Sequence, residues 1–135
     1  MKKYLIDTNI SIFYIKGKYD LYKKFETVEV SNCFISEITL VELKFGIENS
    51  EYPEKNKKAL DDFLTGIKVI PIFNSLDFYA KEKTRLRTLG TLIDDFDLLI
   101  DATAVVNRLV MVTNSINHFK RIKNIDIEDW TIINK

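Results

Sequence analysis

Carboxylates recur in this chain at positions where the neighbouring residues are apolar. Residues 94–101 read DDFDLLID, and Asp94, Asp97 and Asp101 share one helix face at spacings i, i+3 and i+7. A helix dipole stabilises acids in a first turn by about 0.3–1 kcal/mol each, which explains Asp94 and Asp95. Two ionised carboxylates about 5 Å apart repel by about 3 kcal/mol at an effective dielectric of about 20. Asp97 and Asp101 therefore need a retained proton, an intervening Lys or Arg, or a metal ion, and we favour the metal.

Two further acids lie in similar surroundings. Asp7 ends the apolar segment 3–7 and opens a helical pattern, so a helix N-cap is its simplest role. Glu42 lies away from the polar face of the helix expected over residues 37–49. We expect that helix to be buried over most of its circumference with Glu42 directed inward. A buried carboxylate needs an ion-pair partner or a bound cation, and an internal salt bridge is the simpler alternative.

The ligand types indicate which metal these acids would bind. The chain has one cysteine, Cys33, and one histidine, His118, so it has no Cys- or His-rich zinc motif. Oxygen ligands alone suit Mg²⁺ or Mn²⁺, which keep several waters and also bind phosphates. Asp7, Glu42 and Asp97 together could hold such an ion, generate hydroxide from water and neutralise a phosphodiester transition state.

Short apolar segments alternate with helical patterns along the chain. The expected strands are 3–7, 32–36, 68–73 and 109–114, with a further edge strand within 125–130. The expected helices are 8–16, 20–26, 37–49, 53–67, 75–89 and 94–108. This alternation predicts an α/β fold with a mainly parallel sheet and helices on both faces. Ligands of such folds bind beyond the carboxyl ends of the strands, where Asp7, Thr113 and Asn114 are expected.

Composition limits the class of protein. With 135 residues, 46% hydrophobic and 30% charged, the chain is expected to form a single globular domain over residues 1–135. The net charge of +0 is not that of a dedicated nucleic-acid binder. One cysteine fits a reducing cytoplasm, and no segment approaches the ~20 apolar residues of a membrane span.

Basic residues are nevertheless clustered. Lys81, Arg85 and Arg87 fall in one expected helix, and Lys120 and Arg121 follow the last apolar strand. Most such clusters are solvated surfaces, but beside an acidic metal site they are candidates for binding a polyanion backbone.

Five motifs in order resemble the PIN-domain family, with the closest resemblance to VapC-type toxins of bacterial toxin–antitoxin pairs. They are LIDTN (5–9), SEITLVELKFGIE (36–48), DDFDLLIDATAVV (94–106), LVMVTNSINHFKRI (109–122) and IEDW (127–130). The resemblance implies a three-layer α/β sandwich and a Mg²⁺- or Mn²⁺-dependent endoribonuclease. It also implies a homodimer, neutralised by a small antitoxin that inserts a peptide near the active site. The family's acids fall on Asp7, Glu42 and Asp97, and Asn9 matches the polar residue that supports the first acid.

The chain departs from the family pattern at two places. Related sequences usually have a small residue at the position of Asp101, so an extra carboxylate is expected to project toward the site. A fourth acid, where relatives have one, falls in the segment that reads NSINHF here, with Ser115 and His118 at the corresponding positions. We expect Asp101 to substitute in part for this missing acid.

Two other functions compete with the ribonuclease. The first is a PIN-like module that binds nucleic acid with a partner but does not cleave it, because the fourth acid is absent. The second is a phosphotransfer domain of the receiver or phosphatase type, with Asp7 as the phosphorylated residue. The position of Glu42 and the tail ending in IEDW argue against the second.

Overall fold

The computed structural model describes residues 1–119 and 121–132, with residues 118 and 119 described by their backbone alone. The strands are β1 (Tyr4–Ile6), β2 (Cys33–Ser36), β3 (Lys68–Ile70), β4 (Val110–Val112) and β5 (Ile127–Glu128). The α-helices are α1 (Thr8–Ile15), α2 (Leu21–Val28), α3 (Glu37–Glu48), α4 (Pro53–Leu64), α5 (Leu76–Thr88), α6 (Asp95–Val106) and α7 (Ile116–Phe119). Short 3-10 helices, η1 (Val30–Asn32) and η2 (Phe73–Ser75), precede β2 and α5. No helix among the described residues has the length and apolarity that a membrane crossing requires.

The five strands form one sheet in the order β3-β2-β1-β4-β5. Each neighbouring pair is parallel. The expected α/β fold with a parallel sheet is confirmed, and β5 is the expected edge strand. The first strand of the sequence lies at the centre of the sheet, so the polar residues that follow β1 and β4 meet at the same edge.

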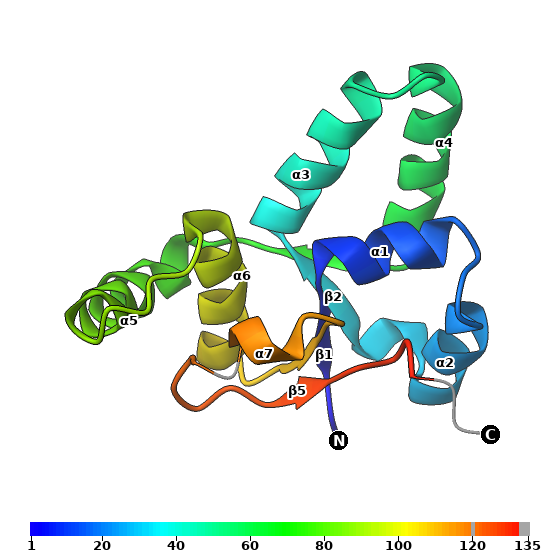
Figure 1. Ribbon diagram of the computed structural model, residues 1–135. Helices are drawn as coiled ribbons and strands as arrows, with labels where there is room; N and C mark the ends of the chain where they lie inside the picture. Colours follow the sequence, from blue (N-terminus) through cyan, green and yellow to red (C-terminus); the bar gives the residue numbers. More distant parts are fainter. Residues whose placement is uncertain (120, 133–135) are drawn as a thin grey trace.

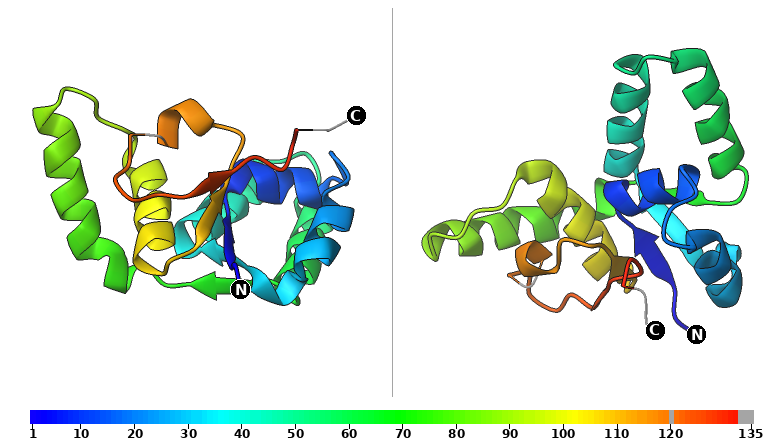
Figure 2. Two further views of the ribbon diagram at one scale, coloured as in Figure 1. Left: turned by 90° about the horizontal axis from the view of Figure 1, so that it is seen from below. Right: turned by 45° about the vertical axis from the view of Figure 1, so that its right-hand side comes forward.

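Alternating side chains of β1 supply two different cores. Tyr4 and Ile6 pack with residues of α1, α2 and α4, whereas Leu5 packs with residues of α6. This period of two is what a strand covered on both faces requires. Helices α5 and α6 lie together on one side of the sheet, and α1, α2 and α4 lie on the other (Figures 1 and 2). The result is the expected three-layer arrangement.

Every expected helix and strand is present, with differences at the ends. The segment 68–73 forms a strand only as far as Ile70, because Pro71 has no N–H to donate to the ladder. The short helix α7 was not predicted, since four residues are too few to show a helical period.

The expectation that residues 37–49 are buried over most of their circumference is wrong. Val41 is 49% exposed and Phe45 is 71% exposed. Helices α3 and α4 project together away from the sheet, so one side of α3 faces solvent along most of its length (Figure 1). Apolar residues around a helix thus did not mean burial here.

Candidate active site

Asp7 combines its two expected roles. It follows β1 directly, and its backbone N–H donates to the Val112 carbonyl at 3.0 Å, which fixes it at the end of the central strand. Its side chain caps α1 by accepting from the Ile10 N–H at 2.8 Å. Burial raises the pKa of Asp7 from 3.8 to about 6, partly offset by hydrogen bonds from Thr113 and Ile10 and reinforced by nearby carboxylates. The cap orients the carboxyl group at the end of β1.

Glu42 reaches the site from the middle of α3. The Thr8 hydroxyl donates to Glu42 Oε1 at 2.7 Å, and the Thr8 and Thr39 hydroxyls lie 3.2 Å apart. These contacts join the start of α1 to α3, next to Asp7. The predicted inward direction of Glu42 is therefore found, and its hydrogen-bond partner is a hydroxyl group.

Asp97 lies in the first turn of α6, and its side chain has a different environment from those of Asp94 and Asp95. Asp94 caps the helix by accepting from the Phe96 N–H at 3.1 Å. Asp95 turns to α5, where it pairs with Lys83 at 2.8 Å. Asp97 instead faces the cavity that Asp7 and Glu42 line. The helix-start explanation therefore fits Asp94, while Asp95 also has an ion-pair partner on another helix.

A cavity of about 530 Å³ lies at the carboxyl ends of the central strands. Its lining residues are Asp7, Thr8, Asn9, Glu42, Asp97, Ile100, Asn114, Ser115, Ile116, Asn117 and Arg121. The three candidate metal ligands and the three supporting residues Asn9, Asn114 and Ser115 all line it. Two polar lining residues were not predicted from the sequence. Thr8 could have been found from its place between the site residues Asp7 and Asn9, whereas nothing in the sequence marks Asn117.

The donor set fits a hydrated divalent cation. Among the described residues, no group of three His, Cys, Asp or Glu side chains is arranged so that it could hold a metal ion by itself. Mg²⁺ keeps several of its waters and needs only one or two carboxylates in direct contact. Carboxylate, amide and hydroxyl oxygens around a cavity of this size provide that environment.

Asp101 places a further carboxyl group beneath the site. It is fully buried one turn after Asp97 and is not among the cavity-lining residues. Neither of its oxygens has a hydrogen-bond partner among the described residues. Burial, with the nearby Asp97 and Asp7 carboxylates, raises the pKa of Asp101 from 3.8 to about 9. An unpartnered acid beside two other carboxylates is what a bound cation would relieve, so this observation supports a metal at the site.

The candidate RNA-binding residues separate in the structure. Arg121 lines the cavity, while Lys81 and Arg87 are exposed on α5 away from it. Arg85 is paired with Glu82 at 2.7 Å, so its charge is already neutralised. Lys120 and the side chain of His118 lie outside the described residues.

Similarity to known proteins agrees with this geometry. The family described as PIN domain matches residues 4–125. The chain therefore belongs to the PIN-domain family. Among its curated relatives, Ribonuclease VapC2 of Rickettsia felis is 37% identical over 130 residues, covering 94% of this chain and 97% of the relative. The tRNA(fMet)-specific endonuclease VapC of Salmonella typhimurium is 34% identical over 131 residues, covering 96% of this chain and 99% of the relative.

A solved structure gives the same result in three dimensions. The crystal structure of VapBC2 from Rickettsia felis, bound to a DNA fragment from their promoter, contains a chain that matches with a TM-score of 0.87 at 34% identity. The match covers 94% of this chain and 98% of that one. The predicted resemblance to VapC-type PIN domains is confirmed.

Proposed function

We propose that this protein is a Mg²⁺- or Mn²⁺-dependent endoribonuclease and the toxin of a toxin–antitoxin pair. The observation that carries the proposal is the convergence of Asp7, Glu42 and Asp97 on one cavity at the carboxyl ends of the central parallel strands. Its curated relatives are named ribonucleases, and the PIN-domain family generally depends on a divalent metal.

In the proposed mechanism Asp7, Glu42 and Asp97 would together hold a hydrated cation at the cavity. When bound there, the cation would supply Lewis acidity and activate a water molecule for attack on the phosphodiester. Thr8 holds Glu42 in place through its hydrogen bond. Asn9, Asn114 and Ser115 offer amide and hydroxyl groups to the waters or to the phosphate.

The names of the relatives indicate which RNA substrate and which kind of partner protein to test first. One is named for cleavage specific to tRNA(fMet), so initiator tRNA is the first RNA to test. The VapBC2 structure contains a partner protein, and we propose a small antitoxin as the partner of this chain. We further propose a homodimer that works in the cytoplasm.

The test is incubation of the purified protein with total RNA and initiator tRNA, with Mn²⁺ or Mg²⁺ and with excess chelator. We expect cleavage that needs the metal, with defined ends mapped by primer extension, and none with Asp7→Asn. Full activity of Asp7→Asn, or activity in chelator, would show that the acids do not carry the reaction.

One observation favours a second candidate, a nucleic-acid-binding module that does not cleave. Residues 114–117, on the side of the cavity where relatives can supply a fourth acid, are Asn, Ser, Ile and Asn. RNA binding without products at any metal concentration would support this module. Cleavage by the wild-type protein would exclude it.

A further inference from the structure

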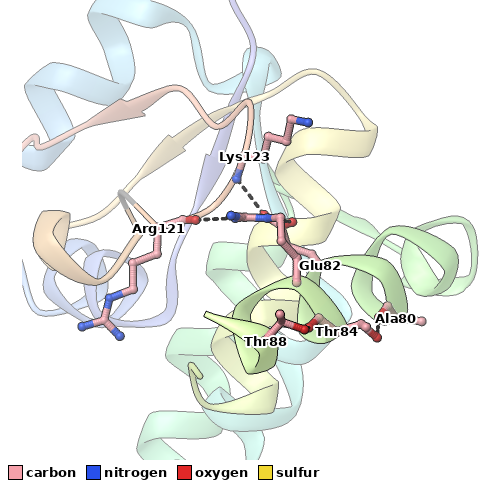
Figure 3. Close-up of polar contacts among 7 residues, drawn as sticks. Ala80, Glu82, Thr84, Thr88, Arg121 and Lys123 are labelled. Atoms are coloured by element: carbon pink, nitrogen blue, oxygen red, sulfur yellow. Dashed lines mark hydrogen bonds and ion pairs between the residues drawn. The ribbon is translucent and has the colours of Figure 1, made fainter. Parts of the chain in front are cut away.

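The loop that follows α7 is attached to α5 through its main chain. The Arg85 guanidinium donates from Nη2 to the Arg121 carbonyl at 2.7 Å. Glu82 Oε2 accepts from the Lys123 N–H at 2.7 Å (Figure 3). Between these two contacts, the Ile122 side chain is buried in the apolar cluster between α5 and α6. Three successive residues of this loop are therefore fixed against α5.

Glu82 and Arg85 also bind each other. Arg85 Nε lies 2.7 Å from Glu82 Oε1, and Nη2 lies 2.9 Å from Oε2. Glu82 is only 5% exposed, and the Arg85 guanidinium beside it holds the pKa of Glu82 below its usual range. Such two-point charge-assisted pairs have a fixed geometry. We call Glu82 and Arg85 the clasp.

The clasp leaves one side chain of the loop directed elsewhere. With its carbonyl bound to Arg85, Arg121 extends its guanidinium away from Glu82 (Figure 3). Arg121 is one of the residues that line the cavity shared by Asp7, Glu42 and Asp97. Among the described residues that line the cavity, Arg121 is the only one with a basic side chain.

A polyanion that approaches three carboxylates needs a compensating cation, and a guanidinium can bind a phosphate with two parallel hydrogen bonds. Arginine is long and flexible, and a displacement of about 1 Å in an active site can cost about 100-fold in rate. We propose that the clasp is a positioning device that holds Arg121 where it binds a phosphate of the RNA substrate. This proposal rests on the proposed ribonuclease function.

The clasp can be removed without leaving a buried charge. Apolar residues of similar volume often replace an ion pair with little loss of stability, and Arg85 is already partly exposed, so the double variant Glu82→Leu with Arg85→Met is expected to fold. Circular dichroism and thermal unfolding verify this. Glu82→Gln is the milder variant, since it keeps the shape but loses the charge.

The measurement is steady-state cleavage of an oligoribonucleotide that contains a site mapped in the total-RNA experiment. Arg121→Ala should raise KM at least tenfold and lower the salt dependence of RNA binding by about one phosphate contact. The double clasp variant should also raise KM. In the Arg121→Ala background, however, the clasp variants should have no further effect, because the clasp acts through that residue.

Asp95→Asn is the matched control, because it also removes an ion pair between α5 and another part of the fold but does not touch the loop after α7. It should leave KM unchanged. Two results would overturn the clasp proposal while leaving the ribonuclease function in place, provided that the wild type cleaves RNA. The first is an unaltered KM in the folded clasp variants. The second is a rise in KM from the clasp variants that adds to the rise caused by Arg121→Ala. A wild-type protein that neither cleaves nor binds RNA would overturn the function and the clasp together.

Discussion

The Thr8 hydroxyl donates a hydrogen bond of 2.7 Å to Glu42 Oε1, across 34 positions of sequence. Thr8 directly follows a candidate metal ligand, and Glu42 is itself one. This contact therefore links the start of α1, which Asp7 precedes, to the middle of α3, which carries Glu42. A ligand held by a neighbouring hydroxyl has its side-chain geometry fixed before the metal arrives.

Thr8→Val should weaken metal binding without unfolding the protein. Valine has the same shape but cannot hold Glu42, and loss of such an outer contact typically costs about 10–100-fold in metal affinity. Titration calorimetry with Mn²⁺ measures the change. Thr27→Val is the control, since its hydroxyl is exposed and bonds only the Lys23 carbonyl. Equal Mn²⁺ affinities of the two variants would contradict this role for Thr8.

Metal binding should weaken as the pH falls through about 6. The pKa of Asp7 is raised to about 6, so a proton competes with the cation for this carboxylate below that pH. The Mn²⁺ dissociation constant should rise about tenfold between pH 7 and pH 5, with most of the change below pH 6. Asp7→Asn should bind weakly with a much flatter pH profile over the same range. A wild-type affinity for Mn²⁺ that does not change between pH 7 and pH 5 would contradict this role of the Asp7 carboxyl group.

Asp101→Asn should stabilise the metal-free protein, with a gain that grows with pH. The folded-state pKa of about 9 lies above the unfolded value, so stability is highest at low pH and falls as the pH rises toward 9. Asparagine removes this loss, at up to about 1.4 kcal/mol per pH unit. Thermal unfolding at pH 5 and pH 8 in chelator tests it. An equal gain in stability at both pH values would contradict the raised pKa of Asp101.

The same variant decides whether Asp101 substitutes for the missing fourth acid. If Asp101 serves the metal, Asp101→Asn should weaken Mn²⁺ binding and slow cleavage even though it raises the melting temperature. Unchanged metal affinity and cleavage rate would assign Asp101 no part in the site.

Glu82→Ala should destabilise the fold more than Asp95→Ala. Glu82 is buried and accepts hydrogen bonds from Arg85 and from the Lys123 N–H, so its removal should cost about 1–3 kcal/mol. Asp95 and Lys83 form a half-exposed pair, for which about 0–1 kcal/mol is typical. Urea unfolding of the two variants side by side gives the comparison.

The sequence predicted which acids would meet at one cavity, Asp7, Glu42 and Asp97, better than it predicted the burial of the helices around them. Asp7 was recognisable because an apolar strand ends there, and Asp97 because it shares a helix face with other acids. The burial expected for Phe45 was wrong, because the sequence does not show whether another element of the fold covers an apolar residue. Only the position of α3 beyond the sheet decides its exposure.

Arg85 and Asp101 illustrate two other limits. Arg85 was taken as an RNA-binding candidate from its basic neighbours, although Glu82 three residues earlier was a visible sign of an ion pair. The spacing of Asp101 correctly placed it near Asp97. How deeply its carboxyl group is buried depends on packing against elements distant in sequence.

The place of β1 at the centre of the sheet also bears on synthesis of the protein. Tyr4 is synthesised long before Val110, yet Val110 is one of its two strand partners. A nascent chain therefore carries Asp7 and Glu42 long before it has the strand that completes the central sheet or the loop that supplies Arg121. Closing such a distant pairing is a late step for a growing chain. The candidate site is thus incomplete until β4 and the loop that carries Arg121 have been synthesised.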